Sequence, residues 1–159
     1  EQNFYEFDLI NTIENSIDSL DAQAKSKDIK IKFKEFDPIW VKGNAELMER
    51  AITNLLSNSI KYSADNTQID IELIPKNKDV HINIIDQGHG IEINELPHIF
   101  KRFHRQKSSE VSGNKGAGLG LNFVKVVVEK HQGQINVTSE KNKGTTFTII
   151  LPFLAEEPN

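Results

Sequence analysis

Two glycine-rich segments constrain this chain of 159 residues more than any other feature of its sequence. The first, residues 86–90, closes an apolar run typical of a strand, and the second, residues 116–120, opens a run typical of a helix. Glycine lets the main chain turn sharply and come close to a flat ligand. A helix start offers free N–H groups and a dipole that favours anions. The two segments therefore predict a site for a ligand that is flat at one end and anionic at the other.

The second segment differs from two familiar phosphate-binding sequences. No lysine followed by serine or threonine closes it, so it is not a P-loop. It is not a dinucleotide-binding fingerprint either, because that sequence has two residues between its second and third glycines and follows a strand. Here one residue separates Gly118 from Gly120, and no predicted strand precedes Gly116. What remains is a glycine-rich helix start that can bind phosphate, with a hinge that only packs as the alternative.

A predicted helix over residues 44–62 carries polar side chains beside its core face. At about 100° per residue, its apolar arc consists of Met48, Ala51, Ile52, Leu55 and Leu56. Asn54, Asn58 and Lys61 fall together beside that arc, with Tyr62 at its edge. Asparagine lowers helix propensity, so two of them here indicate a binding function, with a solvated stripe as the alternative. Their amide oxygens suit Mg²⁺, and Lys61 can contact phosphate.

Asp86 stands where the predicted strand over residues 80–85 ends. Its carboxylate could accept a hydrogen bond from the exocyclic amine of an adenine, and the glycines after it let the main chain approach the ring. An ordinary aspartate–glycine turn is the alternative. Together with the amides and the glycine-rich helix start, Asp86 predicts a site for ATP with Mg²⁺.

Composition limits the class of protein. With 37% hydrophobic residues, the chain can form one domain with a core, predicted over residues 1–154 and followed by a frayed tail at 155–159. The formal charge of −4 argues against a nucleic-acid partner. Cysteine is absent, which excludes disulfides and cysteine-based metal sites. No apolar run approaches the roughly 20 residues of a membrane span.

The order of the predicted elements favours an α+β fold, a two-layer sandwich of helices on an antiparallel-leaning sheet. Seven strands are predicted, over residues 4–9, 29–33, 38–41, 68–74, 80–85, 134–138 and 145–151. Three helices are predicted, from residue 8 or 11 to 27, over 44–62 with Asn44 as N-cap, and over 119–131. Residues 91–117 have a flexible composition and are predicted to form a lid.

In combination, these segments resemble the catalytic ATP-binding domain of bacterial two-component sensor histidine kinases. Residues 54–63 resemble the family's asparagine box, and residues 86–90 resemble its first glycine box. Residues 99–105 resemble its phenylalanine box, residues 116–125 its second glycine box and residues 144–147 its closing strand. The resemblance implies a Bergerat-type ATP-binding fold, a mixed sheet backed by three helices. Departures are mild: Gln87 replaces a usual asparagine, Ser59 replaces a common alanine, and His89 is an unusual residue between the glycines.

The resemblance also implies a role for each residue of the site. Asn58, assisted by Asn54, would hold Mg²⁺, and Lys61 and Arg105 would contact the phosphates. Asn58, Lys61 and Arg105 are therefore the predicted catalytic residues. Asp86 would bind the adenine amino group. The predicted ATP-binding residues are Asn54, Asn58, Lys61, Tyr62, Asp86, Gly88, Gly90, Phe103, Arg105, Gly116, Gly118, Leu119, Gly120 and Thr145.

The activity that the resemblance implies is transfer of the γ-phosphoryl group of Mg-ATP to a histidine. No histidine of this chain is followed by an acidic residue on a suitable helix, so the acceptor is expected on a separate dimerisation domain of the same sensor. A response regulator is the expected indirect partner. This part of the sensor is expected to be monomeric and cytoplasmic, and its parent protein to be a membrane-anchored homodimer.

Three alternatives remain. The first is an ATPase of the gyrase and heat-shock chaperone type, which would need a glutamate one turn before Asn58 to activate water. The sequence has Asn54 at that position, and Glu49 cannot replace the glutamate because it lies on the far side of the predicted helix. A degenerate kinase would bind nucleotide and dock partners without phosphorylating them. A serine kinase of the anti-sigma-factor type has a similar fold, but Phe100 and Phe103 favour the histidine kinases.

Overall fold

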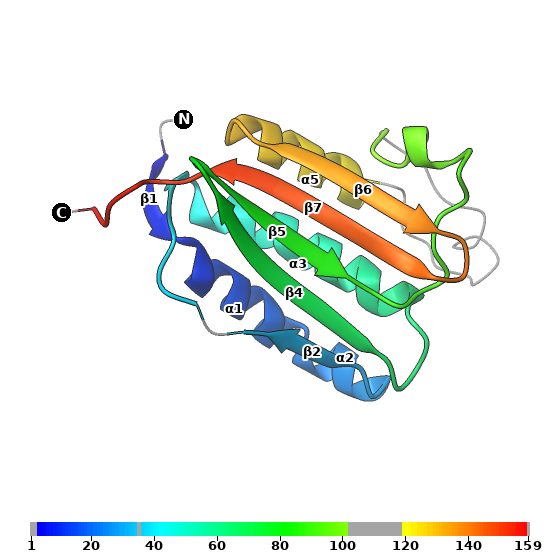
Figure 1. The fold of residues 1–159 in the computed structure, drawn as a ribbon. Helices are drawn as coiled ribbons and strands as arrows, with labels where there is room; N and C mark the ends of the chain where they lie inside the picture. The colour runs from blue at the N-terminus through cyan, green and yellow to red at the C-terminus, as the bar shows by residue number, and fades with distance from the viewer. Residues whose placement is uncertain (1–2, 35, 102–118, 159) are drawn as a thin grey trace.

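The computed structural model of the chain describes residues 3–34, 36–101 and 119–158. Within them, a layer of helices covers one face of a five-stranded sheet (Figure 1). The elements in chain order are β1 (Tyr5–Asp8), α1 (Leu9–Ser19), α2 (Asp21–Ser26), β2 (Lys30–Phe33), β3 (Trp40–Gly43), α3 (Ala45–Tyr62), β4 (Gln68–Lys76), β5 (Asp79–Ile85), η1 (Leu96–His98), α5 (Leu119–Lys130), β6 (Gln134–Glu140) and β7 (Gly144–Pro152). The predicted α+β sandwich is confirmed.

The main sheet is mixed. Its strand order is β2-β4-β5-β7-β6, in which β2 and β4 run parallel and all other neighbours run antiparallel. Strands β1 and β3 pair with each other in a separate two-stranded sheet. This separation is not predicted, because alternation of apolar side chains marks a strand without saying which partner it pairs with.

Helix α3 forms where the sequence predicts it. The side chain of Asn44 accepts a hydrogen bond from the Leu47 N–H at 3.0 Å and so caps the helix. The predicted apolar arc is fully buried at Met48, Ala51, Ile52, Leu55 and Leu56. Each buried leucine or isoleucine stabilises the fold by about 1.5–3 kcal/mol. The arc therefore fixes the rotation of α3 and places Asn54 and Asn58 at the edge of the core.

The long first helix that periodicity predicts is two helices in the structure, separated at Leu20. The Leu20 N–H bonds the Ile17 carbonyl at 3.1 Å, which is the tighter i to i−3 pattern. The hydroxyls of Ser16 and Ser19 bond carbonyls of preceding residues and so compete with the helix hydrogen bonds. Apolar periodicity runs on across the interruption, because Leu20 and Ala24 are both buried. The predicted single helix is therefore wrong.

The loop after β5 lies at one end of the molecule, and β1 and the segment after β7 lie at the other (Figure 1). Residues 91–101 of the predicted lid are described and include the short 3-10 helix η1. The rest of the predicted lid, residues 102–117, lies outside the described residues. In the described ranges, no helix combines the length and the apolar content needed to cross a membrane.

Candidate functional site

Asp86 is fixed at the point where β5 ends. Its N–H donates to the Thr145 carbonyl at 2.9 Å, so it continues the pairing of β5 with β7. Its Oδ1 accepts hydrogen bonds from the N–H groups of Gly88 at 2.9 Å and Thr145 at 3.2 Å. The residue is only 7% exposed, and this burial raises the pKa of its carboxyl above the ordinary value, against the lowering effect of those two bonds. The other oxygen, Oδ2, accepts neither of these two bonds.

The glycines after Asp86 are required by the protein's own packing. A Cβ on Gly88 would lie 2.5 Å from the carbonyl oxygen of Tyr62. Ser63 and Gly88 form an isolated β-bridge, and the His89 N–H donates to the Tyr62 carbonyl at 3.2 Å. Close contact with the end of α3 therefore explains Gly88, a reason that differs from the sharp turn and the approach to a ligand that the sequence suggested.

The turn between β6 and β7 fixes the other side of this loop. Gly90 has a φ of +73°, and a Cβ there would overlap the Glu140 carbonyl. The Ile91 N–H donates to the Ser139 hydroxyl at 2.7 Å, and that hydroxyl lies 2.9 Å from the hydroxyl of Thr145. The loop after Asp86 is thus attached to α3 on one side and to the β6–β7 turn on the other.

A pocket opens beside Asp86. Its lining residues are Asn58, Ser59, Tyr62, Asp86, His89, Gly90, Ile91, Thr145 and Phe147. The space between these residues measures about 370 Å³, a figure that includes open solvent. Five residues predicted from the sequence meet here: Asn58, Tyr62, Asp86, Gly90 and Thr145. Asp86 is the only carboxylate among the described residues that line it.

Sequence reasoning assigned no role to Ser59, His89, Ile91 or Phe147, which also line the pocket. Ser59 is 2% exposed, and its hydroxyl has no hydrogen-bond partner among the described residues. It nevertheless lies close enough to Asp86 to lower the pKa of that carboxyl. A buried hydroxyl without a partner is rare, so Ser59 is a polar group available to a ligand or a water. Its departure from the alanine common in the family is the signal that could have indicated it.

The remaining amide lies at the start of α5. The Nδ2 atom of Asn54 is 4.0 Å from the position that a Cβ on Gly120 would occupy. Asn54 therefore faces the first turn of α5, where the free N–H groups of that helix favour an anion. Asn54 and Asn58 lie one turn apart on α3, and both are half-buried. Amide oxygens of this kind can bind a magnesium ion that also binds phosphate.

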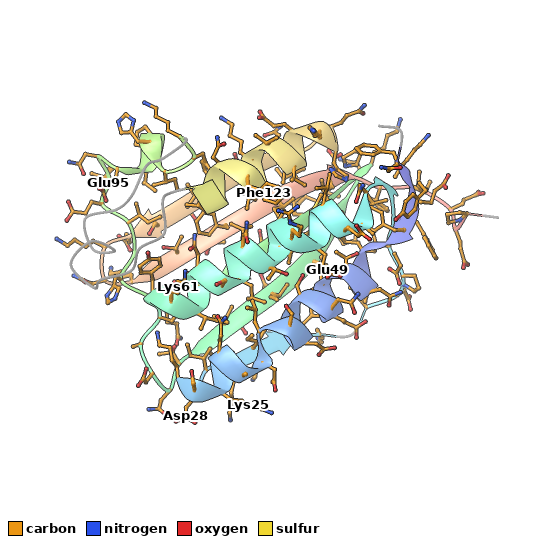
Figure 2. The ribbon with its side chains drawn as sticks, turned by 180° about the vertical axis from the view of Figure 1, so that it is seen from behind. Lys25, Asp28, Glu49, Lys61, Glu95 and Phe123 are labelled. Atoms are coloured by element: carbon orange, nitrogen blue, oxygen red, sulfur yellow. The ribbon has the colours of Figure 1, made fainter. Side chains whose placement is uncertain are left out.

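Lys61 and Glu49 lie at different parts of α3. Lys61 is exposed in the last turn of α3, whereas Glu49 lies on the side of that helix that faces α1 (Figure 2). The Ser16 hydroxyl of α1 donates to the Glu49 carbonyl at 3.2 Å, which agrees with that placement. Glu49 is thus not beside the amides. Phe103, Arg105, Gly116 and Gly118 lie outside the described residues, and Leu119 is the first residue of α5.

The part of the chain that builds this pocket matches a known family. Residues 43–155 match the model described as histidine kinase-, DNA gyrase B- and HSP90-like ATPase. The chain belongs to this family. The matched range runs from the end of β3 to beyond β7 and so contains every residue that lines the pocket. The family is one of ATPases and kinases that share an ATP-binding domain.

Relatives of the chain are bacterial sensor proteins. The heme sensor protein HssS of Staphylococcus haemolyticus is 36% identical over 118 residues, which are 74% of this chain and 25% of that protein. The sensor-like histidine kinase SenX3 of Mycobacterium tuberculosis is 31% identical over 154 residues, which are 97% of this chain and 38% of that protein. The chain thus spans well under half the length of these relatives.

Solved structures of histidine kinases share the fold. The mycobacterial sensor histidine kinase MprB matches with a TM-score of 0.81 at 29% identity, over 94% of this chain and 97% of that chain. The nucleotide-free catalytic domain of the histidine kinase ThkA gives the same TM-score and coverage at 22% identity, which bears on the fold alone. The resemblance to histidine kinase catalytic domains that the sequence predicts is confirmed.

Proposed function

We propose that this chain binds Mg-ATP and transfers its γ-phosphoryl group to a histidine on a partner dimerisation domain. One observation carries the proposal. A buried carboxylate, Asp86, and an amide, Asn58, line the same pocket, and a second amide, Asn54, faces the N-terminus of α5. These groups match the two ends of an adenine nucleotide, since the carboxylate suits the amine of the ring and the amides suit the metal and phosphates.

The adenine would be bound by Asp86. The two main-chain bonds to Oδ1 hold the carboxylate in place, so that Oδ2 can accept from the exocyclic amine. Tyr62 and Phe147 supply apolar surface in the same pocket for the ring. Ser59 places a hydroxyl beside the carboxylate and can bond a water or a ring nitrogen.

The phosphates would lie between α3 and the start of α5. The N–H groups of the first turn of α5 would donate to phosphate oxygens, with Lys61 as a neighbouring positive charge. Asn54 and Asn58 would hold Mg²⁺, which when bound neutralises phosphate charge. Arg105 and the glycines at 116 and 118 are proposed to contact the phosphates on the basis of the family resemblance.

In the transfer step, a neutral imidazole nitrogen of the acceptor histidine attacks the γ-phosphorus. A P–N bond forms while the P–O bond to ADP breaks, and ADP leaves with the electron pair. Catalysis consists mainly of positioning and of offsetting charge on the transferred group. Hydrolysis is disfavoured, because the residue one turn before Asn58 is an amide, Asn54, which cannot take a proton from water.

The wider organisation follows from the same proposal. Residues 1–154 would act as one catalytic unit, monomeric by itself, inside a longer homodimeric sensor. The parent protein would be anchored in the membrane with this unit exposed to cytosolic ATP, and it would pass the phosphoryl group on to a response regulator.

The experiment mixes the chain with γ-labelled ATP and a histidine-bearing helical dimerisation domain. Acid-labile, base-stable label on the partner supports transfer to histidine, whereas acid-stable label would indicate a serine kinase. Asn58→Ala should abolish transfer and the dependence of ATP binding on Mg²⁺, and Asn15→Ala, on an exposed position of α1, should change neither. ATP binding without any transfer would indicate a docking module.

A further inference from the structure

The C-terminus of α3 is closed by a side chain from a distant segment. The last carbonyls of any helix lack partners within the helix, and its final turn frays unless something else bonds them. In α3 that turn carries Lys61 and Tyr62, and Ser63 follows directly. The geometry of these residues therefore depends on what bonds the free carbonyls.

Lys27 supplies those bonds. Its Nζ donates to the carbonyls of Ile60 at 2.8 Å, Lys61 at 3.2 Å and Ser63 at 2.6 Å. An ammonium group has three N–H donors, and these three carbonyls use all of them. Its positive charge also lies at the negative end of the helix dipole. The carbonyl of Lys27 in turn accepts from the Asn66 N–H at 2.9 Å, so the segment after α3 is bonded to Lys27 twice.

The segment that Lys27 holds is the one that supports the loop after Asp86. Ser63 forms the β-bridge with Gly88, and the Tyr62 carbonyl accepts from the His89 N–H at 3.2 Å. The Gly88 N–H then donates to Asp86 Oδ1 at 2.9 Å. A continuous set of contacts thus connects the ammonium of Lys27, outside the pocket, to the carboxylate inside it.

We propose that Lys27 is a positioning residue of the nucleotide site: its ammonium fixes the end of α3 and, through Ser63 and Gly88, the orientation of Asp86. The proposal rests on the proposed function for its ligand, adenine nucleotide, but its structural part does not need the ligand. Lys27 does not line the pocket, so it acts through Tyr62 and Ser63 and not by touching ATP.

Lys27→Met tests the proposal, since methionine keeps most of the length of the side chain and removes its charge and donors. Amide hydrogen exchange of the full chain without nucleotide should become faster both over residues 60–68 and over residues 86–91. ATP affinity should fall about 10-fold, because an Asp86 that is held less firmly makes a weaker hydrogen bond to the adenine amine. In the transfer assay, KM for ATP should rise while kcat stays unchanged.

Matched variants separate positioning from general stability. Lys25→Met removes an exposed lysine, paired with Asp21 at 2.9 Å, and should leave exchange and affinity unchanged. Lys27→Arg keeps a charged donor group and should restore much of the affinity. If Lys27→Met melts near the assay temperature, Lys27→Gln, which keeps donors without charge, replaces it and should give a smaller loss.

Two results would overturn the proposal. One is faster exchange confined to residues 60–68, with residues 86–91 and ATP affinity unchanged, which would make Lys27 a helix cap and nothing more. The other is an equal loss of affinity in Lys25→Met and Lys27→Met. A wild-type chain that binds no ATP would instead refute the proposed function, and the exchange data would still decide the role of Lys27.

Discussion

Asp86→Asn changes the hydrogen-bonding character of the pocket with little change in shape. The asparagine oxygen can keep both main-chain bonds that Oδ1 accepts, from Gly88 at 2.9 Å and from Thr145 at 3.2 Å. Its NH₂ group then takes the place of Oδ2 and presents a donor where the adenine amine also presents one. The variant should therefore fold normally and bind ATP poorly.

The size of the loss follows from the burial of Asp86, which is 7% exposed. A hydrogen bond to a charged group contributes about 1.5–3 kcal/mol, which corresponds to a loss of about 10- to 150-fold in ATP affinity. Inosine triphosphate carries a carbonyl in place of the amine, so its affinity for the variant should rise relative to ATP. Titration calorimetry with both nucleotides measures the ratio, and Asp70→Asn, on the half-buried Asp70 of β4, is the control.

The stability of Asp86→Asn has an expected sign. Burial raises the pKa of Asp86, so the folded state binds its proton more tightly than the unfolded chain does. At pH values above the pKa of Asp86 in the folded protein, the ionised carboxylate therefore lowers the free energy of unfolding. This effect disappears as pH falls below 3.8, the ordinary pKa of an aspartate in the unfolded chain. The unfolding free energy of Asp86→Asn at pH 7 should equal or exceed that of the wild type. Equal weakening of ATP and inosine triphosphate, or a clear loss of stability, would refute this account of the pocket.

Further predictions concern packing and pH. Gly88→Ala should lower the unfolding free energy by about 1–3 kcal/mol, because its Cβ would lie 2.5 Å from the Tyr62 carbonyl oxygen. Gly120→Ala, whose Cβ would have no described neighbour nearer than 4.0 Å, should be neutral or gain up to about 1 kcal/mol; similar urea midpoints for the two variants would contradict this. His131 is buried, and burial lowers its pKa; its Nε2 accepts from the Asn44 N–H at 2.9 Å. Because the unfolded chain then binds the proton more tightly, stability should fall as pH drops below about 6.5. Urea titrations at several pH values should show a shallower fall in His131→Gln, and an unchanged slope would count against this role.

Local sequence signals predicted most of the elements. The arc from Met48 to Leu56 and the Asn44 cap fixed the position and rotation of α3, because both signals depend on residues within one helix. The alternation of β5 likewise predicted the strand that ends at Asp86. These parts of the fold could be predicted since their causes lie a few residues apart in the chain.

Contacts between distant segments could not be predicted in this way. The hydrogen bonds of Lys27 join residues 33 to 36 positions apart, and no periodic pattern marks such a lysine. Gly88 was identified, but its reason, contact with the Tyr62 carbonyl, depends on how α3 packs against the end of β5. The interruption at Leu20 was missed because the apolar period continues through it. Family resemblance supplied the roles of the site residues, which spacing alone left open.

The attachment of residues 86–91 on both sides has a consequence for recognition. Bonds from the end of α3 and from the β6–β7 turn fix this loop before any ligand arrives. Its loss of conformational freedom is then a cost of folding and not of association, which favours a rigid, pre-shaped base pocket. Chemical variation among ligands should accordingly be tolerated at the phosphate end and penalised at the ring.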